Sequence, residues 1–268
     1  MLEQTQPFVS NMKISIITVS FNSAKTIEDT IQCVLNQTYK NIEYIVVDGA
    51  SKDETPHIIQ KYQEQITKVI SEPDYGIYDA MNKGIRAATG DVIAFLNADD
   101  SYVSNRVLER VIQAFQEHDT DSVYGDLCYV SEENTNEILR YWKAGTYTET
   151  SFLNGWMPPH PTFFVKRSVL EKYGIFDPTF RLSGDYELIL RLLYKHKISA
   201  HYIPFCMVKM RIGGNGNKWI ENRLMSNLED RLAWKKNKLK FRLYTPYLKP
   251  MRKIFQFAKM HPKAAFLT

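Results

Sequence analysis

The sequence is poor in cysteine and has no long apolar run. Its three cysteines, Cys33, Cys128 and Cys206, are odd in number and lack metal-ligand spacing, which favours reduced thiols over disulfides or a zinc site. No stretch approaches the roughly eighteen consecutive apolar residues of a membrane-spanning helix. Residues 1–11 lack the basic and apolar pattern of a signal peptide. We therefore expect a cytoplasmic protein in which residues 1–12 form a flexible leader.

Glycine-rich phosphate-binding loops are also missing. The sequence contains no G-x-x-x-x-G-K-[ST] motif, and its one glycine cluster, residues 213–217, does not follow a strand-to-helix turn. These absences argue against ATPases, kinases and nicotinamide-dependent dehydrogenases. The cluster itself predicts a flexible loop. With 44% hydrophobic and 24% charged residues, the chain has the composition of a globular protein.

Short buried strands alternate with helices over the first half of the chain. Residues 13–19 and 42–47 are β-branched runs with few polar interruptions, which is typical of strands buried on both faces of a parallel sheet. The other expected strands are residues 69–70, 92–96, 122–130, 138–142, 162–165 and 202–211. The expected helices are residues 23–36, 77–88 and 186–194, with shorter ones near residues 58–62 and 107–115. This alternation predicts an α/β fold with a doubly wound, mainly parallel, Rossmann-like sheet and helices on both of its faces.

The same pattern suggests how the chain is divided into domains. We expect residues 13–217 to form a single α/β domain and residues 218–268 to form a helical appendage. The appendage begins with a helical stripe of leucines, Leu224, Leu228 and Leu232. From residue 231 to the end, the chain carries eleven Lys or Arg and no Asp or Glu, which leaves 23 basic and 30 acidic residues in the first 230. The protein is thus an acidic body with a basic tail.

Polar side chains follow each of the first four expected strands. These clusters are residues 20–23, 48–53, 72–75 and 97–100. In doubly wound sheets, ligands bind beyond the carboxyl ends of the strands. The sequence therefore predicts a ligand site at this edge of the sheet.

Asp99 and Asp100 lie side by side directly after the strand expected at residues 92–96. Adjacent carboxylates at such an edge repel each other and lose hydration, so water or a cation has to compensate them. Oxygen ligands on a short loop suit Mg²⁺ or Mn²⁺, which would also bind the phosphates of a substrate. An alternative is that residues 99–101 only turn the chain and cap a helix that begins near Ser104.

A second acidic loop, residues 48–55, lies between a buried strand and a helix. Asp48 in this loop can accept hydrogen bonds from the base or ribose of a nucleoside. The start of the following helix offers free N–H groups to negative charge. The alternative is capping alone, with Asp53 as the cap of that helix.

Taken together, five motifs resemble those of an inverting family 2 glycosyltransferase with the GT-A fold, over residues 13–216. The motifs are Thr18 with Ser20-Phe21-Asn22, then Asp48-Gly-x-Ser51-x-Asp53-x-Thr55, Tyr75-Gly-Ile-Tyr78-Asp-Ala-Met-Asn82-Lys83-Gly84-Ile85, Asn97-Ala98-Asp99-Asp100 and Gly184-Asp185-Tyr186-Glu187-Leu188. The resemblance implies metal-dependent transfer of a hexose or N-acetylhexosamine from a nucleotide diphosphate. The implied acceptor is a hydroxyl of a glycan or lipid-linked molecule, as in the assembly of a bacterial surface polysaccharide.

The resemblance also implies a role for individual residues. It assigns Asp99 to Mg²⁺ or Mn²⁺ and Asp185 to the catalytic base. The residues expected to bind the nucleotide sugar are Thr18, Ser20, Asn22, Asp48, Ser51, Asp53, Asp74, Lys83, Asn97 and Ala98. Further candidates, for the acceptor site or a lid, are Trp156, His160 and Arg211. The alternatives are that Lys83 is solvated, His160 is a plain loop residue and Trp156 packs in the core.

Two residues depart from the pattern of the family. Asn97 stands where the family often has an aspartate, which removes a charge but keeps a hydrogen-bond acceptor. Gly184 stands where a glutamate commonly precedes the base, and Glu187 is therefore a rival to Asp185. Helix neighbours two residues apart point in different directions, so the two carboxylates are expected to face different surroundings. The alternative function is a non-catalytic nucleotide-sugar-binding protein on the same fold.

The basic tail has three interpretations. It is a solvated helix, or it attaches to an anionic membrane at the inner face, where a lipid-linked acceptor would lie, or it binds nucleic acid. An apolar side made of Met251, Ile254, Phe255 and Ala258, flanked by basic residues, fits the membrane. No nucleic-acid recognition motif accompanies the charge. Binding to anionic liposomes that weakens with salt would identify the membrane interpretation.

Overall fold

The computed structural model describes residues 11–212 and 216–240, and the side chains of all of these except residues 216–224. Its strands are β1 (Ile14–Ser20), β2 (Ile42–Asp48), β3 (Lys68–Ser71), β4 (Val92–Phe95), β5 (Asp100–Tyr102), β6 (Ser122–Ser131), β7 (Ile138–Trp142), β8 (Phe164–Lys166) and β9 (Ala200–Ile212). Its α-helices are α1 (Ile27–Leu35), α2 (Thr55–Lys61), α3 (Ile77–Ala87), α4 (Val107–His118), α5 (Arg167–Tyr173), α6 (Gly184–Ile189) and α7 (Gly216–Lys236). A π-helical segment, Leu190–Lys195, continues α6, and 3-10 turns cover Phe152–Asn154 and His160–Thr162.

The described strands form one sheet in the order β3-β2-β1-β4-β8-β6-β9-β5, with β7 paired to β6. The first four strands in this order are parallel, as are β6 and β9, whereas β5, β7 and β8 run antiparallel to their neighbours. Ser20 at the end of β1 lies beside Asp48 of β2, and Asp48 lies beside Ser71 of β3. The carboxyl ends of these strands therefore meet at one edge, and the predicted α/β fold is confirmed.

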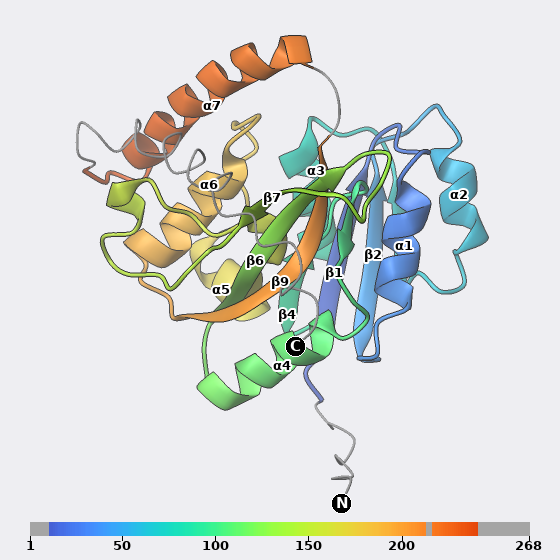
Figure 1. Ribbon diagram of the computed structural model, residues 1–268, viewed down its shortest axis with the longest axis horizontal. Helices are drawn as coiled ribbons and strands as arrows, with labels where there is room; N and C mark the ends of the chain where they lie inside the picture. Colours follow the sequence, from blue (N-terminus) through green and yellow to red (C-terminus); the bar gives the residue numbers. More distant parts are fainter. Residues whose placement is uncertain (1–10, 213–215, 241–268) are drawn as a thin grey trace, which may run out of the picture.

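Alternate residues of the central strands face two different layers of helices (Figure 1). On one face, Ile17 and Val19 of β1 belong to a core that includes residues of α3, α5 and α6. On the other face, Ile14 and Ile16 belong to a core that includes residues of α1, α2 and α4. Because side chains alternate along a strand, one apolar strand supplies both cores. The predicted helices on both faces of the sheet are thus present.

Several element limits differ from the predictions. Residues 100–102 form β5, which pairs with β9 so that Asp100 lies opposite Met210, and α4 begins only at Val107. Pairing between residues so distant in sequence leaves no local pattern. The first helix begins at Ile27 instead of residue 23, because the carbonyl of Ser23 accepts the N–H groups of Thr26 and Ile27 in a turn. Residues 216 and 217 lie in α7, although the glycine cluster predicts a loop there.

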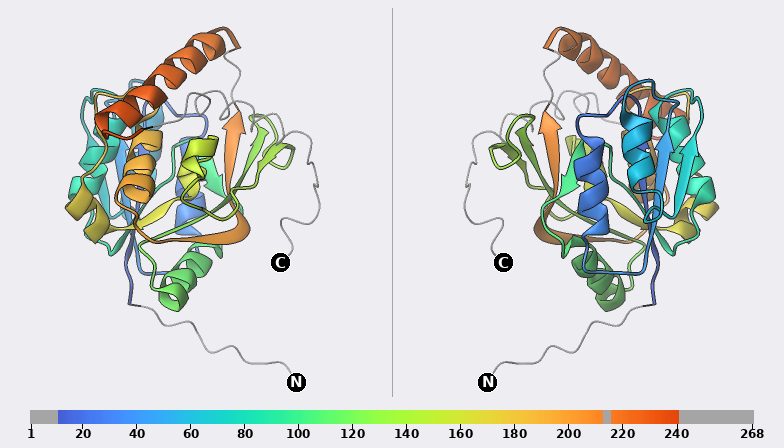
Figure 2. Two further views of the ribbon diagram at one scale, coloured as in Figure 1. Left: turned by 90° about the vertical axis from the view of Figure 1, so that its left-hand side faces the viewer. Right: turned by 90° about the vertical axis from the view of Figure 1, so that its right-hand side faces the viewer.

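The helix α7 is present, but two leucines of the predicted stripe, Leu228 and Leu232, face outward. Leu228 and Leu232 are 58% and 38% exposed, whereas Ala233 and Trp234 are buried. Figures 1 and 2 show α7 at the carboxyl-end edge of the sheet, alongside α6. The leucine stripe predicts the helix correctly, but it does not predict which face is buried. The reason is that the buried face mixes polar and aromatic groups.

Two parts of the predicted organisation lie outside the described residues. They are residues 1–10 of the expected leader and residues 241–268 of the tail, including the helix expected near Met251. The leader, the appendage and the boundary between domains therefore stay predictions. Within residues 11–212 and 216–240, no helix combines the length and the apolar character needed to span a bilayer.

Glu43 connects three segments at the edge of the sheet opposite the polar loops. Its carboxylate, in a residue that is only 5% exposed, accepts hydrogen bonds from Ser15 Oγ at 2.5 Å and from Thr89 N and Oγ1 at 2.7 and 2.6 Å. Lys13 Nζ lies 3.3 Å from it. Burial raises the pKa of Glu43, but these donors together outweigh burial and lower the pKa from 4.5 to about 2.

Because the folded state lowers this pKa, ionised Glu43 stabilises the protein above pH 4.5, and this contribution is lost as the pH falls from 4.5 towards 2. Its size is about 3 kcal/mol. We predict that Glu43→Gln lowers the free energy of unfolding at pH 7 and flattens its pH dependence between pH 4.5 and 2. Urea denaturation across this range measures both effects, with the exposed Glu64→Gln as the control. The prediction would be contradicted if the free energy of unfolding changed equally with pH, between pH 4.5 and 2, in Glu43→Gln and in the unmutated protein.

Candidate active site

The loops after β1 and β2 are joined to each other by backbone and side-chain hydrogen bonds. Gly49 N donates to the carbonyl of Ser20 at 2.9 Å, and Asn22 N donates to Ser51 Oγ at 2.8 Å. The Asn22 side chain accepts the N–H of Lys52 at 2.9 Å in return. Asn22 and Ala50 have φ angles of 50° and 60°, a left-handed region that non-glycine residues rarely adopt. Such conformations gather at functional sites and are held by their surroundings.

Asp48 connects the starts of these loops through hydrogen bonds. Its buried carboxylate accepts hydrogen bonds from the hydroxyls of Ser20, Ser51 and Ser71 at 3.1, 2.5 and 3.2 Å, and from Ser51 N at 3.0 Å. Thr18 is also fully buried and accepts from the hydroxyl of Tyr44 at 3.1 Å. Thr18, Ser20 and Asp48 thus form the floor of the predicted nucleotide site. The direct contact of Asp48 with a nucleoside stays a prediction.

Two aromatic side chains stand above this floor. Phe21 is 63% exposed and Tyr75 is 97% exposed, although both are large apolar groups. Phe21 reaches over Gly49, where an added Cβ would lie 3.4 Å from its ring. Sequence reasoning did not select Phe21 as a binding residue, and its aromatic character inside a polar turn is the signal that could have found it. Exposed rings beside a nucleotide site are suited to stack on a base.

The remaining predicted nucleotide residues border the same loops. Asp53 is exposed and accepts the N–H groups of Ala24 and Thr55 at 3.1 and 3.0 Å, so it links the loops as well as preceding α2. Asp74 accepts the N–H of Gly76 at 2.9 Å and lies so close to Gly49 that a Cβ there would be 2.4 Å from its Oδ2.

Lys83 is not simply solvated, because its ammonium group contacts the loop after β3. Its Nζ donates to the carbonyl of Pro73 at 2.6 Å and lies 2.9 Å from Glu72 and 3.7 Å from Asp79. The hydrogen bond and charge of Glu72 raise the pKa of Lys83 although desolvation opposes the shift. The predicted contact of Lys83 with a phosphate stays a prediction, and its present partners brace the loop.

In the acidic loop, the two aspartates differ sharply. Asp99 is exposed as a residue, but the protein around its carboxyl group removes part of its hydration. This desolvation raises the pKa of Asp99, although the charges of Arg211 and His160 act in the opposite direction. Asp100 is fully buried in β5, where neither carboxyl oxygen makes a well-formed hydrogen bond with the described residues. Burial and then the charge of Asp99 raise the pKa of Asp100 well above its usual value, against the effect of Arg211 and Asn97. No side chain caps α4, so the alternative that Asp100 caps this helix is wrong.

Arg211 fixes the position of this loop. Its guanidinium donates to the carbonyl of Asp99 at 3.0 Å and forms an ion pair with Asp29 of α1. The Arg211 side chain is 8% exposed. These contacts make Arg211 a brace between β9, the acidic loop and α1, while its proposed part in a lid stays a prediction.

The donor atoms of the acidic loop fit a metal that is held partly by substrate. Asn97 Oδ1 is buried without a partner among the described residues, and the Asp99 carboxylate lies exposed beside it in the chain. No group of three or more His, Cys, Asp or Glu is placed to hold a metal within residues 11–212 and 225–240. Mg²⁺ needs few protein ligands where waters and substrate phosphates complete its coordination. Asp99, with Asn97, therefore fits a Mg²⁺ or Mn²⁺ ion bound together with a diphosphate.

Asp185, at the start of α6, has a partner for each carboxylate oxygen. His160 Nδ1 lies 3.0 Å from Asp185 Oδ2, and the Tyr78 hydroxyl donates to Oδ1 at 3.2 Å. The Tyr78 ring stacks on Phe176 with centroids 5.3 Å apart. His160, a predicted acceptor residue, thus touches the predicted base. Sequence reasoning did not assign a role to Tyr78, because its contact with Asp185 spans 107 positions.

Gly184 explains one departure from the pattern of the family. A Cβ at this position would lie 2.7 Å from the Tyr78 ring, closer than real Cβ contacts. The ring therefore occupies the space into which a larger side chain at Gly184 would extend. Replacing the expected glutamate by glycine allows Tyr78 to reach Asp185.

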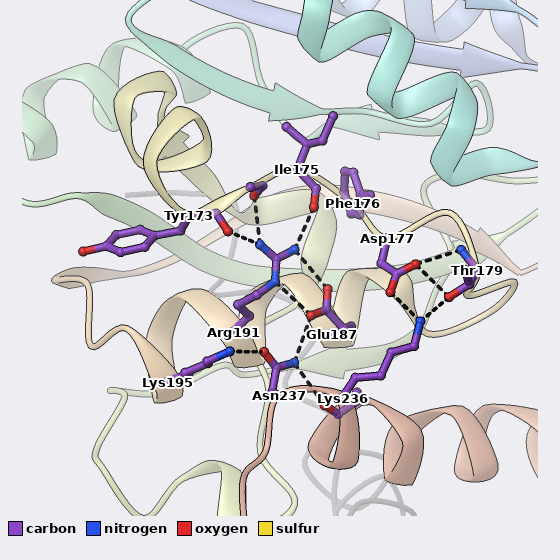
Figure 3. Close-up of polar contacts among 12 residues, drawn as sticks. Tyr173, Ile175, Phe176, Asp177, Thr179, Glu187, Arg191, Lys195, Lys236 and Asn237 are labelled. Carbon is purple, nitrogen blue, oxygen red and sulfur yellow. Dashed lines mark hydrogen bonds and ion pairs between the residues drawn. The ribbon is translucent and has the colours of Figure 1, made fainter.

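Glu187, the rival base, belongs to a separate network (Figure 3). Its carboxylate lies 2.8 Å from Arg191 Nε and accepts from Asn237 Nδ2 at 2.9 Å. A second contact, from Arg191 Nη2, measures 3.1 Å. Glu187 is 4% exposed, and this arrangement gives it a structural role. The geometry favours Asp185 as the base.

A cavity of about 340 Å³ opens beside Asp185. Its polar lining residues are Asn97, His160, Arg181 and Asp185. Its apolar lining residues are Ile77, Tyr78, Met81, Phe95, Phe163, Val165, Phe176, Leu182, Leu188, Ile189 and Met210. The cavity thus brings the acidic loop of β4 and the start of α6 to one site.

Trp156 does not line this cavity. Its ring is 5% exposed, packs edge-on against Tyr124 and Phe152, and donates from Nε1 to the carbonyl of Ala144 at 2.7 Å. The structure gives Trp156 the core role that the sequence left open. Ala98 is also buried, at 4% exposure, so only its backbone can serve a ligand.

Comparison with known proteins identifies the family. The model of glycosyl transferase family 2 matches residues 15–182, so the chain belongs to this family, as its motifs predict. An uncharacterised glycosyltransferase of Nostoc sp. is 34% identical over 202 residues, which cover 70% of this chain and 62% of that protein. A PGL/p-HBAD biosynthesis glycosyltransferase of Mycobacterium tuberculosis is 29% identical over 226 residues, or 80% of this chain and 83% of that protein. The match thus spans less than two thirds of the Nostoc relative.

Solved structures share the fold. A mannosyltransferase, PcManGT from Pyrobaculum calidifontis in complex with GDP-Man and Mn²⁺, superposes with a TM-score of 0.64 at 17% identity, covering 96% of this chain and 73% of that chain. Residues 1–349 of TarS from S. aureus, in complex with UDP-GlcNAc, superpose with a TM-score of 0.62 at 16% identity, covering 81% and 66%. These likenesses confirm the predicted GT-A fold. The catalytic candidate Asp185 lies beyond the residues that the family model matches.

Proposed function

We propose that the protein transfers a sugar from a nucleotide diphosphate to an acceptor hydroxyl, with Asp185 as the general base and inversion at the anomeric carbon. The observation that supports this most directly is the position of His160. Its ring contacts Asp185, and both residues line one cavity with Asn97 of the acidic loop, which supports a site that includes the predicted base and the loop of the predicted metal ligand. Relatives named as glycosyltransferases, and neighbours bound to UDP-GlcNAc and GDP-Man, support a nucleotide-sugar donor.

The chain's own residues divide the work of this reaction. The floor around Asp48 and the exposed Phe21 would hold the nucleoside, while the loop at Asp99 would face the diphosphate. Asp185 would take the proton of the acceptor hydroxyl as its oxygen bonds to the anomeric carbon and the diphosphate leaves. General-base catalysis of this kind contributes about 10² to 10⁴ in rate.

Asp185 needs a fixed orientation for this role. His160 and Tyr78 contact different oxygens of its carboxylate, and Asp185 also lines the cavity in which an acceptor would lie. A single displacement with one base inverts the anomeric centre. A divalent cation on Asp99, when bound, would neutralise charge that develops on the leaving diphosphate.

The first prediction concerns Asp99 and separates an enzyme from a binding protein. With Mn²⁺ present, we expect release of UDP from UDP-GlcNAc or GDP from GDP-mannose, and a loss of at least about a hundredfold in Asp99→Ala. Thermal shift with the same nucleotide sugars measures binding. Binding without turnover of either donor by the unmutated protein would favour the non-catalytic alternative. The matched control is Asp121→Ala, a half-buried aspartate that does not line the cavity.

The second prediction concerns the base. Asp185→Asn keeps the shape of the side chain but cannot accept the proton, so we expect unchanged donor affinity and a fall in kcat of about 10² to 10⁴. Glu187→Gln serves as the comparison and is expected to lower thermal stability, because it weakens the pair with Arg191, while kcat stays within a few-fold. Transfer that survives in Asp185→Asn and disappears in Glu187→Gln would move the role of base to Glu187.

We also propose that the acceptor binds through an apolar group. Sugar hydroxyls buried against an apolar wall lose hydrogen bonds to water without replacement, whereas a hydrocarbon or aromatic group gains by leaving water. The cavity beside Asp185 has an apolar wall, and the exposed Ile77 and Leu182 extend it to the surface. An acceptor with an apolar part next to its hydroxyl-bearing part, such as a lipid-linked glycan, fits this lining.

The acceptor prediction compares octyl or phenyl glycosides with the matching free sugars. We expect at least a tenfold lower KM for the glycosides, and a several-fold weaker preference in Ile77→Ser, whose side chain is exposed in the unmutated protein. Steady-state transfer assays with one donor measure this preference. Equal KM values for the paired acceptors would remove the proposal without affecting the assignment of Asp185.

A further inference from the structure

Helix α7 is attached to the segment of chain that carries Asp185. Lys236 Nζ lies 2.7 Å from Asp177, Trp234 Nε1 donates to the hydroxyl of Tyr186 at 2.8 Å, and Asn237 bonds to Glu187 (Figure 3). The contacts lie before and after Asp185 in the chain. The match to the family covers residues 15–182, so α7, Tyr186 and Glu187 lie beyond it, whereas Asp177 lies within it.

One residue of α7 contacts the backbone just before the base. The carboxylate of Glu229, in a residue that is 8% exposed, accepts the N–H groups of Arg181, Leu182 and Ser183 at 3.0, 2.9 and 2.8 Å. A carboxylate forms stronger hydrogen bonds than a neutral acceptor, and three converging donors satisfy much of its capacity. Glu229 therefore determines the path of three consecutive residues.

The side chains of these three residues are placed differently from one another. Arg181 and Leu182 are exposed, Leu182 to 39%, and both line the cavity beside Asp185. Ser183 is buried, but its hydroxyl also meets α7, at 2.9 Å from Ser226 Oγ. Among the described residues, α7 thus supplies the acceptor for all three backbone N–H groups of the segment and a partner for the hydroxyl of Ser183.

We infer that Glu229 is a positioning residue, which places Asp185 and the mouth of the acceptor cavity by holding the backbone of residues 181–183. The inference rests on the proposed function. Gly184 follows this segment directly, so movement of the segment changes both the entry of the chain into α6 and the approach of Tyr78 to Asp185. The nucleotide loops lie on other elements, after β1, β2 and β3, and do not depend on Glu229.

The experiment compares full-length Glu229→Gln with the unmutated protein. Gln keeps the volume of Glu229 but presents an NH₂ group to at least one of the three donors. We expect amide hydrogen exchange at residues 181–183 to become about tenfold faster, kcat for UDP or GDP release to fall at least tenfold, and the binding of UDP or GDP to stay within about twofold. Ser226→Ala removes only the hydroxyl contact with Ser183. We expect it to change amide exchange at residues 181–183 and kcat in the same direction, but by a smaller factor.

Lys236→Ala is the matched control, because it breaks the contact of α7 with Asp177, which lies outside residues 181–183. We expect it to speed exchange near Asp177 and to leave exchange at residues 181–183 and kcat within about twofold. Unchanged exchange at residues 181–183 in Glu229→Gln, or a loss of kcat that only parallels a loss of nucleotide binding, would overturn the inference. An unmutated protein that turns over no donor would overturn the proposed function, while the exchange data would still show whether Glu229 holds this segment.

Discussion

The hydrogen-bonded carboxylate of Asp48 is the feature on which the loops of the predicted nucleotide site depend. Four hydrogen bonds connect it to residues from β1, from its own loop and from β3. A buried carboxylate is costly unless its oxygens are satisfied, and here two donors come from the ends of the adjacent parallel strands and two from Ser51 of its own loop. The in-register alignment of Ser20, Asp48 and Ser71 makes this possible. The sheet thus builds its own polar floor from residues far apart in sequence.

The second half of the site is assembled differently. Asp185 lies on a short helix beyond the first four strands, and its orientation comes from His160, Tyr78 and the attachment of α7. Each of these partners belongs to a different segment. The predicted donor site, built on a parallel sheet, therefore faces a proposed base whose position depends on contacts between separate segments.

The two halves also differ in how far the sequence predicts them. The strands β1, β2 and β4 carry local apolar patterns, and the polar clusters at their ends follow from a rule about parallel sheets. The partners of Asp185 follow from no such rule, because the contact with Tyr78 joins residues distant in the chain. Asp100 was expected to support a turn or a helix cap. Its burial results from pairing of β5 with β9, which no local pattern encodes.

Helix α7 shows the limit of periodicity as a guide. Leu228 and Leu232 predict a helix correctly, yet the buried face carries Glu229 and Trp234, and the buried Asn237 follows the helix directly. A spacing rule identifies which residues share a face, but which face is covered depends on what lies opposite. Here the opposite surface is a strip of backbone N–H groups and polar side chains, so charged and amide groups are the better match.

The close approach of Gly184 and Tyr78 has a consequence for how this site can change over time. The ring of Tyr78 and a side chain at residue 184 compete for one volume, so the two positions are not independent. A descendant that regains glutamate at residue 184 has to surrender the tyrosine or move it. We therefore expect relatives to show covariation between these two positions, although 106 positions separate them in the chain.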